Sequence, residues 1–153
     1  MEYRARMPTP FAVLGIRTES DVLIGIDFLS LDASAMAPGD PFTVEVCRQL
    51  RAYLEDASRP FELPIATGGT AFQRRVWKEI ARIPCGETRT YAEVAERIGS
   101  GARAVGNACG ANRVPLVIPC HRVVSSHGIG GFMNANGGVG RDVKRWLLQH
   151  ERR

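Results

Sequence analysis

Residues 90–110 read TYAEVAERIGSGARAVGNACG, and their pattern predicts two short helices joined by a tight turn. Thr90 followed by Glu93 is a capping-box pattern, which predicts a helix over 91–98 that a glycine then ends. A second helix, over 102–109, follows within a few residues. This arrangement is typical of a helix-turn-helix, although an ordinary helical hairpin packed in a core has the same pattern.

The second of these helices is unusual because nearly all of its side chains are tiny. Small residues let a helix backbone come very close to a partner, and Arg103 is the one long side chain near the helix start. An arginine at that place would be odd in a core, so it shifts the balance toward DNA binding. The small residues are Ala102, Ala104, Gly106, Ala108 and Gly110.

The residues around this stretch predict further helices. Thr70 and Gln73 form another capping box, and Pro84 stops the helix that they begin. After the helix-turn-helix candidate, a short apolar run closes at Pro119, and a last amphipathic helix is predicted over roughly 141–150. The C-terminal part of the chain is therefore expected to be mostly helical.

The N-terminal part predicts a small sheet with one helix. Strands over 11–17 and 22–31 are expected to pair as a hairpin. A helix is expected over 41–56, and a short third strand over 61–65. The apolar face of the second strand is expected to carry Val22, Ile24, Ile26 and Phe28. The fold class is thus α+β, with a small antiparallel sheet and a helix followed by a mostly helical domain.

Composition and charge narrow the class of protein. The 153 residues are 44% hydrophobic and 24% charged, which is ordinary for a globular protein. The chain has no apolar run of membrane-spanning length, and its start does not resemble a secretory signal. We therefore expect a cytosolic or nuclear protein, and its compact form favours a bacterial cytoplasm. Residues 1–60 carry a net charge of −3 and residues 61–153 one of +7. The basic half favours a polyanionic partner, although solubility alone would also explain it.

The four cysteines, at positions 47, 85, 109 and 120, include no C-x-x-C pair. In a chain without an export signal this pattern predicts reduced thiols rather than disulfides. Zinc sites need Cys and His ligands at short spacings, and we predict neither a metal nor a cofactor.

Cys120 carries the sharpest chemical signal. It lies between Pro119 and His121, with Arg122 next. A thiol is a poor nucleophile until it is deprotonated, and the histidine or the arginine could raise the thiolate fraction. Neighbours in an extended strand point to opposite faces, so Cys120 and His121 meet only if the backbone turns here, and Asn112 could brace such a turn. An inert buried cysteine is the alternative.

The segment Pro119-Cys120-His121-Arg122-Val123 resembles the active-site signature of the O6-alkylguanine-DNA alkyltransferase family. The resemblance covers about residues 70–151, whereas the first 60 residues fit only in general character. Other matches in family order are Phe72-Gln73, Val76-Trp77, Ile83-Pro84 with Gly86, Tyr91, Arg103-Ala104-Val105-Gly106, Asn112 and Trp146-Leu147-Leu148.

The resemblance implies direct repair of duplex DNA by a monomer. Cys120 would take the alkyl group from O6-alkylguanine, with O4-alkylthymine a possible further substrate, in a single irreversible turnover. His121 would act as base through a water, Glu151 would orient the imidazole, and Asn112 would support the site. The implied domains are a structural lobe over 1–66 and a DNA-binding and alkyl-transfer domain over 67–153.

The resemblance also implies a set of DNA-contacting residues. The helix-turn-helix would enter the minor groove, and Arg103 would fill the gap left by a flipped base. Tyr91 would contact the flipped guanine and donate to it as charge builds. The residues implied in contacts with DNA or the base are Tyr91, Arg103, Ala104, Gly106, Arg122 and Val123.

This sequence departs from the family pattern at three places, and other classes of protein stay open. The turn before Arg103 is shorter than usual, Arg113 stands where a proline is common, and the stretch 128–140 is longer. A non-catalytic alkyltransferase-like protein would bind lesions with the same fold but lack the reactive cysteine. A helix-turn-helix regulator would not need Cys-His, and a Cys-His hydrolase would need an oxyanion site, of which the sequence gives no sign.

Overall fold

The computed structural model describes residues 2–128 and 139–152. Backbone contacts divide the chain into two compact units, Met1–Thr67 and Gly68–Arg153, one residue away from the expected boundary. The mixed fold with an antiparallel sheet confirms the α+β prediction. Among the described helices, none combines the length and apolar character that a membrane span requires.

The first unit contains a three-stranded antiparallel sheet in the order β1-β2-β3. Strand β2 (Val13–Glu19) lies between β1 (Ala5–Pro8) and β3 (Val22–Leu29). The hairpin between β2 and β3 confirms the predicted pairing. Strand β1 was not predicted, because it has only four residues and ends at a proline, too short for a periodic signal.

The prediction for the buried face of β3 was wrong in part. Ile26 is fully buried as expected, but so is Leu23, whereas Ile24 is only half-buried. The pairing register shifts here, because Arg17 of β2 faces Gly25 and Thr18 faces Leu23. One extra residue in β3 forms a bulge, and a bulge reverses the alternation of side chains along a strand.

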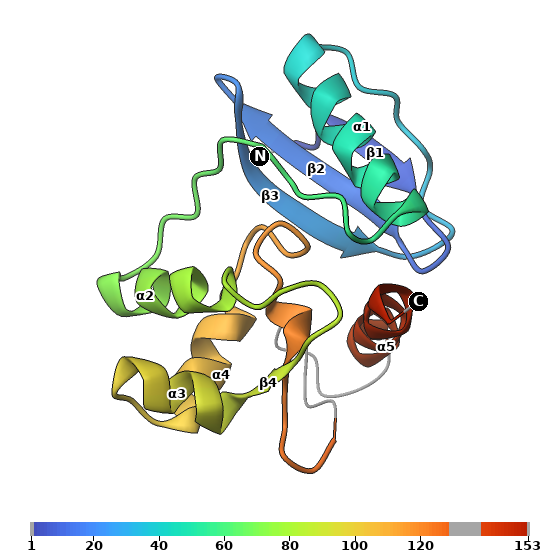
Figure 1. The fold of residues 1–153 in the computed structure, drawn as a ribbon. Coiled ribbons are helices and arrows are strands. Elements are labelled where there is room, and N and C mark those ends of the chain that lie inside the picture. Colours follow the sequence, from blue (N-terminus) through green and yellow to red (C-terminus); the bar gives the residue numbers. More distant parts are fainter. Residues whose placement is uncertain (1, 129–138, 153) are drawn as a thin grey trace. The chain divides into compact units, whose positions relative to one another are not determined.

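Helix α1 (Pro41–Glu55) lies along one face of this sheet (Figure 1). Asp40 caps it, accepting a hydrogen bond from the Thr43 backbone N–H at 3.0 Å, and Pro41 occupies the first helical position. The Thr43 hydroxyl bonds to that of Thr18 on β2 at 2.8 Å. The predicted third strand over 61–65 was wrong, because only Ile65 forms an isolated bridge to the sheet.

The second unit consists mainly of four helices among its described residues. They are α2 (Ala71–Ile80), α3 (Tyr91–Ile98), α4 (Ala102–Gly110) and α5 (Val139–Glu151). Both predicted capping boxes are present. The buried Trp77 ties α2 to α4, because its indole N–H donates to the Ala108 carbonyl at 2.8 Å. Gly99 ends α3 in the left-handed conformation, which favours glycine.

A short pair of parallel strands positions the remaining segment. Strand β4 (Arg89–Thr90) pairs with β5 (Val123–Val124). The first strand leads directly into α3, and the second follows the 3₁₀ turn η1 (Cys120–Arg122). The pairing therefore brings the start of α3 close to the predicted nucleophile.

Candidate active site

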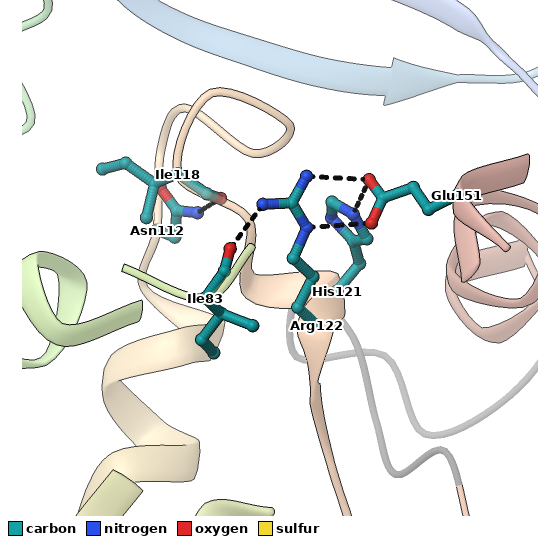
Figure 2. Close-up of polar contacts among 6 residues, drawn as sticks. All are labelled: Ile83, Asn112, Ile118, His121, Arg122 and Glu151. Atoms are coloured by element: carbon teal, nitrogen blue, oxygen red, sulfur yellow. Dashed lines mark hydrogen bonds and ion pairs between the residues drawn. The ribbon is translucent and has the colours of Figure 1, made fainter. Parts of the chain in front are cut away.

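Cys120 lies buried at the start of η1, with 2% of its surface exposed. The Asn112 side-chain amide donates to its Sγ at 3.1 Å and to the Ile118 carbonyl at 3.0 Å. The Asn112 Oδ1 accepts from the Val114 backbone N–H at 2.9 Å, so one side chain fixes both ends of the loop before the cysteine. Figure 2 shows the Asn112–Ile118 contact. This loop holds Leu116 with φ of +75°, a strained conformation for a branched side chain.

The two residues that follow the cysteine, His121 and Arg122, belong to a buried ionic network that Figure 2 shows. His121 Nε2 is 2.6 Å from Glu151 Oε2, and neither side chain is more than 1% exposed. Arg122 binds the same carboxylate through two nitrogens, at 2.8 and 3.1 Å, and donates to the Ile83 carbonyl at 2.7 Å. Glu151 is therefore held by a bidentate arginine, and it in turn fixes the imidazole.

The network sets the tautomer of His121. Burial lowers the pKa of His121 below its usual value, although Glu151 acts in the opposite direction, so the ring is neutral at pH 7. A carboxylate only accepts hydrogen bonds, so Nε2 carries the proton and Nδ1 keeps its lone pair. Nδ1 is buried and has no hydrogen-bond partner among the described residues. The ring is thus prepared to accept a proton at this atom.

The thiol of Cys120 is protonated at rest. The neighbouring Cys109 thiol, within hydrogen-bonding reach, and burial together raise the pKa of Cys120 well above that of a free thiol. The Asn112 amide and the positive charge of Lys144 act in the opposite direction. Reaction at this sulfur therefore requires a base that removes its proton.

Tyr91 and Lys144 complete the cluster. The Lys144 ammonium is buried, donates to the Val123 carbonyl at 2.7 Å and lies 3.4 Å from the Tyr91 hydroxyl. Burial lowers the pKa of Lys144 to about 8, whereas burial and the two nearby thiols raise the pKa of Tyr91 to about 12. At neutral pH the phenol is therefore a hydrogen-bond donor close to a cation.

Comparison with known proteins identifies the family of this chain. The family model described as "6-O-methylguanine DNA methyltransferase, DNA binding domain" matches residues 71–153. The chain belongs to this methyltransferase family. Among curated relatives, the methylated-DNA–protein-cysteine methyltransferase of Methanosarcina mazei is 40% identical over 132 residues, which are 81% of this chain and 80% of that protein. That of Shigella flexneri is 51% identical over 91 residues, 58% of this chain and 51% of that protein, so the match spans about half of that relative.

Solved structures of the family extend the comparison to the whole chain. The Mycobacterium tuberculosis O6-methylguanine methyltransferase is 36% identical, with a TM-score of 0.80 over 99% of this chain and 92% of that one. A structure of the same protein in complex with DNA matches with a TM-score of 0.78. Family membership makes this chain a DNA-binding methyltransferase of DNA repair.

The other residues that the family resemblance singled out lie in two places. Arg103 is exposed and Ala104 and Gly106 are half-buried on α4, whose first residue follows Gly101 without a side-chain cap. A side chain added at Gly106 would meet no atom within 4 Å, so the fold itself does not require glycine there. Arg122 and Val123 lie in the active-site network instead, engaged with Glu151 and Lys144, so their contact with a base stays a prediction.

Sequence reasoning missed two members of the cluster. Lys144 lies seven residues before Glu151 on α5, with Leu147 and Leu148 between them, and this spacing places all four on one helix face. That periodicity was a signal, because a lysine on the buried stripe of a helix is unusual. Cys109 gave no such signal, because nothing in the sequence shows that the end of α4 meets the loop before Cys120.

Proposed function

We propose that this chain repairs DNA by transferring an alkyl group from the O6 atom of guanine to Sγ of Cys120, irreversibly and once per molecule. The observation that carries the proposal is His121, neutral and bonded to Glu151 through Nε2, with a buried and unpartnered Nδ1 next in sequence to the nucleophile. An inert structural cysteine would need no such base.

The transfer is an in-line displacement at the alkyl carbon. A water bound at His121 Nδ1 takes the proton of the Cys120 thiol and passes it to the imidazole, while Glu151 stabilises the cation that forms. The thiolate attacks the carbon, the C–S bond forms and the C–O6 bond breaks with its electron pair left on guanine. The product is a thioether. None of the described residues provides a reaction that would remove the alkyl group from the sulfur, so each molecule acts once.

Tyr91 and Lys144 would assist the leaving guanine. Negative charge builds on the base as the C–O6 bond breaks, and a donor aimed at that charge stabilises the transition state. The pKa of Tyr91 at about 12 keeps its proton available for a hydrogen bond to the base. The Lys144 ammonium, 3.4 Å from the phenol oxygen, makes that oxygen a stronger donor.

The helix-turn-helix would present the lesion. The small and open surface of α4 at Ala104 and Gly106 lets the helix approach the minor groove closely, and Arg103 on its first turn would occupy the space of the flipped nucleotide. Flipping costs a few kcal/mol, and less for a weakly paired damaged base. O4-alkylthymine, which presents the same alkyl–oxygen bond, is a second substrate in this proposal.

The test is mass spectrometry of the protein after mixing with a duplex that contains one O6-methylguanine. The peptide with Cys120 should gain one CH₂, in no more than one equivalent per protein. Cys120→Ser should stay unmodified, whereas Cys85→Ser, which changes a half-buried thiol outside the network, should react like the unchanged protein. If the duplex binds but Cys120 stays unmodified, the protein is a lesion sensor and the proposal is wrong.

A further inference from the structure

A second thiol lies against the nucleophile, and the proposed transfer does not use it. Cys109, at the end of α4, is 7% exposed, and its thiol is within hydrogen-bonding reach of the Cys120 thiol. The two cysteines come from segments that the Asn112 side chain joins, because Asn112 follows α4 and donates to Cys120 Sγ at 3.1 Å. Asn112 thus contacts both residues, because its backbone N–H donates to the Cys109 carbonyl at 3.2 Å and its side-chain amide donates to the Cys120 sulfur.

The surroundings of the pair differ from those of an inert buried cysteine. The buried Lys144 ammonium interacts electrostatically with both sulfurs, and so does the Tyr91 hydroxyl. The amide donor of Asn112 and the cation of Lys144 both favour negative charge on Cys120. The Cys109 thiol and burial outweigh these two groups and keep the pKa of Cys120 above that of a free thiol, so the thiolate that an oxidant attacks forms only when a base such as His121 takes the proton.

We propose that Cys109 is a resolving cysteine, which forms a reversible disulfide with Cys120 when a peroxide oxidises the site. The proposal rests on the proposed function for its consequence, because the disulfide would block alkyl transfer until a thiol reductant restores it. All four cysteines are free in the structure, and in this proposal the transfer requires Cys120 in that reduced form.

The chemistry balances with a hydroperoxide as the oxidant. The Cys120 thiolate attacks one peroxide oxygen, the O–O bond breaks, and the leaving oxygen departs with its electron pair and takes up a proton. Cys120 is now a sulfenic acid. The Cys109 sulfur attacks the sulfenic sulfur, the S–S bond forms, and hydroxide leaves and takes the Cys109 proton to give water. The S–S bond that forms is about 2 Å long, so the two sulfurs must move closer together than a hydrogen-bonded pair of thiols.

Without Cys109, oxidation of Cys120 should lead to a different product. A sulfenic acid that meets no thiol is oxidised further to sulfinic acid, which dithiothreitol does not reduce. Cys109 would therefore preserve the nucleophile through oxidation. Because the thiolate is the attacking form, the first step should become faster as the pH rises.

The experiment treats the full chain with hydrogen peroxide in the absence of DNA, alkylates the remaining thiols and maps peptides without reduction. The unchanged protein should give a peptide pair linked through Cys109 and Cys120, and dithiothreitol should restore nearly all of its lost transfer capacity. Cys109→Ala and Cys109→Ser should give sulfinic acid at Cys120 and no recovery. Cys85→Ser and Cys47→Ser, which change thiols outside the pair, should behave like the unchanged protein.

The inference is wrong if the unchanged protein shows sulfinic acid at Cys120 without the linked pair, or if Cys120 links to another cysteine or another molecule. It is also wrong if the Cys109 variants recover as fully as the unchanged protein. The linked peptide is measured without any DNA substrate, so a failure of alkyl transfer leaves this test intact.

Discussion

Gly106 provides a test in which protein stability and DNA binding should change in opposite directions. The residue lies within α4, its φ is not positive, and a Cβ added there would contact nothing within 4 Å. Alanine is favoured over glycine inside a helix by about 0.5–1 kcal/mol. Gly106→Ala should therefore stabilise the free protein by about that amount, which raises Tm by about 2–8 °C for a unit of this size.

The same methyl group should weaken binding to DNA. If the open surface at Gly106 is where the minor groove lies, an added side chain enters filled space, and overpacking costs about 1–3 kcal/mol. That cost corresponds to roughly 5- to 150-fold in the dissociation constant. Gly106→Leu should lie at the upper end, and Gly106→Ala at or below the lower end.

The assay pairs thermal unfolding of the free protein with fluorescence anisotropy of a labelled duplex that carries O6-methylguanine, at one fixed salt concentration because binding to DNA depends strongly on salt. Gly39→Ala is the matched control, because a Cβ there also meets nothing, but the residue lies in the first unit. A Gly106→Leu variant that binds as tightly as the unchanged protein would refute the placement of DNA against this surface. A Gly106→Ala variant of lowered stability would refute the helix argument.

Three further predictions concern charge and backbone strain. Glu151→Gln removes the negative charge that stabilises the His121 cation, so the single-turnover transfer rate per folded molecule should fall roughly 100-fold or more, and a near-normal rate would rule out His121 as the base. The pKa of Lys144 falls from 10.5 to about 8 on folding, so the unfolded chain binds more protons than the folded chain between these pH values. The free-energy cost of burying the ammonium in the folded protein therefore disappears as the pH rises through this range. The stability of Lys144→Met relative to the unchanged protein, measured by urea unfolding, should therefore drop by about 3 kcal/mol across this range, and a constant difference would contradict the burial of the charge. Asp21→Gly replaces a residue with φ of 60° in the two-residue hairpin turn and should stabilise the first unit by about 1 kcal/mol in the same assay, and an unchanged or lowered stability would contradict this strain argument.

Local signals accounted for the helices and for the reactive residues. Capping boxes at Thr70 and Thr90 act within four residues of sequence, so they can be read without the fold. The grouping of Cys120 and His121 was visible because the two are adjacent. Glu151 came from the family resemblance alone, since a partner thirty residues away leaves no local trace.

Features that depend on tertiary contact could not be predicted. The bulge at Ile24 depends on the register between two strands. The alternation of apolar residues alone therefore predicted the wrong face of the strand for Leu23. The segment from Phe61 to Ile65 has the composition of a strand, but only Ile65 pairs with the sheet, through one isolated bridge. Cys109 became a neighbour of the nucleophile only through the turn that Asn112 closes.

The buried indole of Trp77 gives the molecule an internal optical reporter. Its N–H is bonded to the Ala108 carbonyl, one residue before Cys109 on the helix that we place against DNA. Indole emission shifts with the polarity and hydrogen bonding around the ring, so a displacement of α4 would alter its wavelength or intensity. Trp146, the second tryptophan, stacks on His150 with 4.9 Å between the ring centroids. Trp146→Phe would leave Trp77 as the single tryptophan of the protein. Stopped-flow fluorescence of that variant would then follow lesion binding and alkylation in real time without a label.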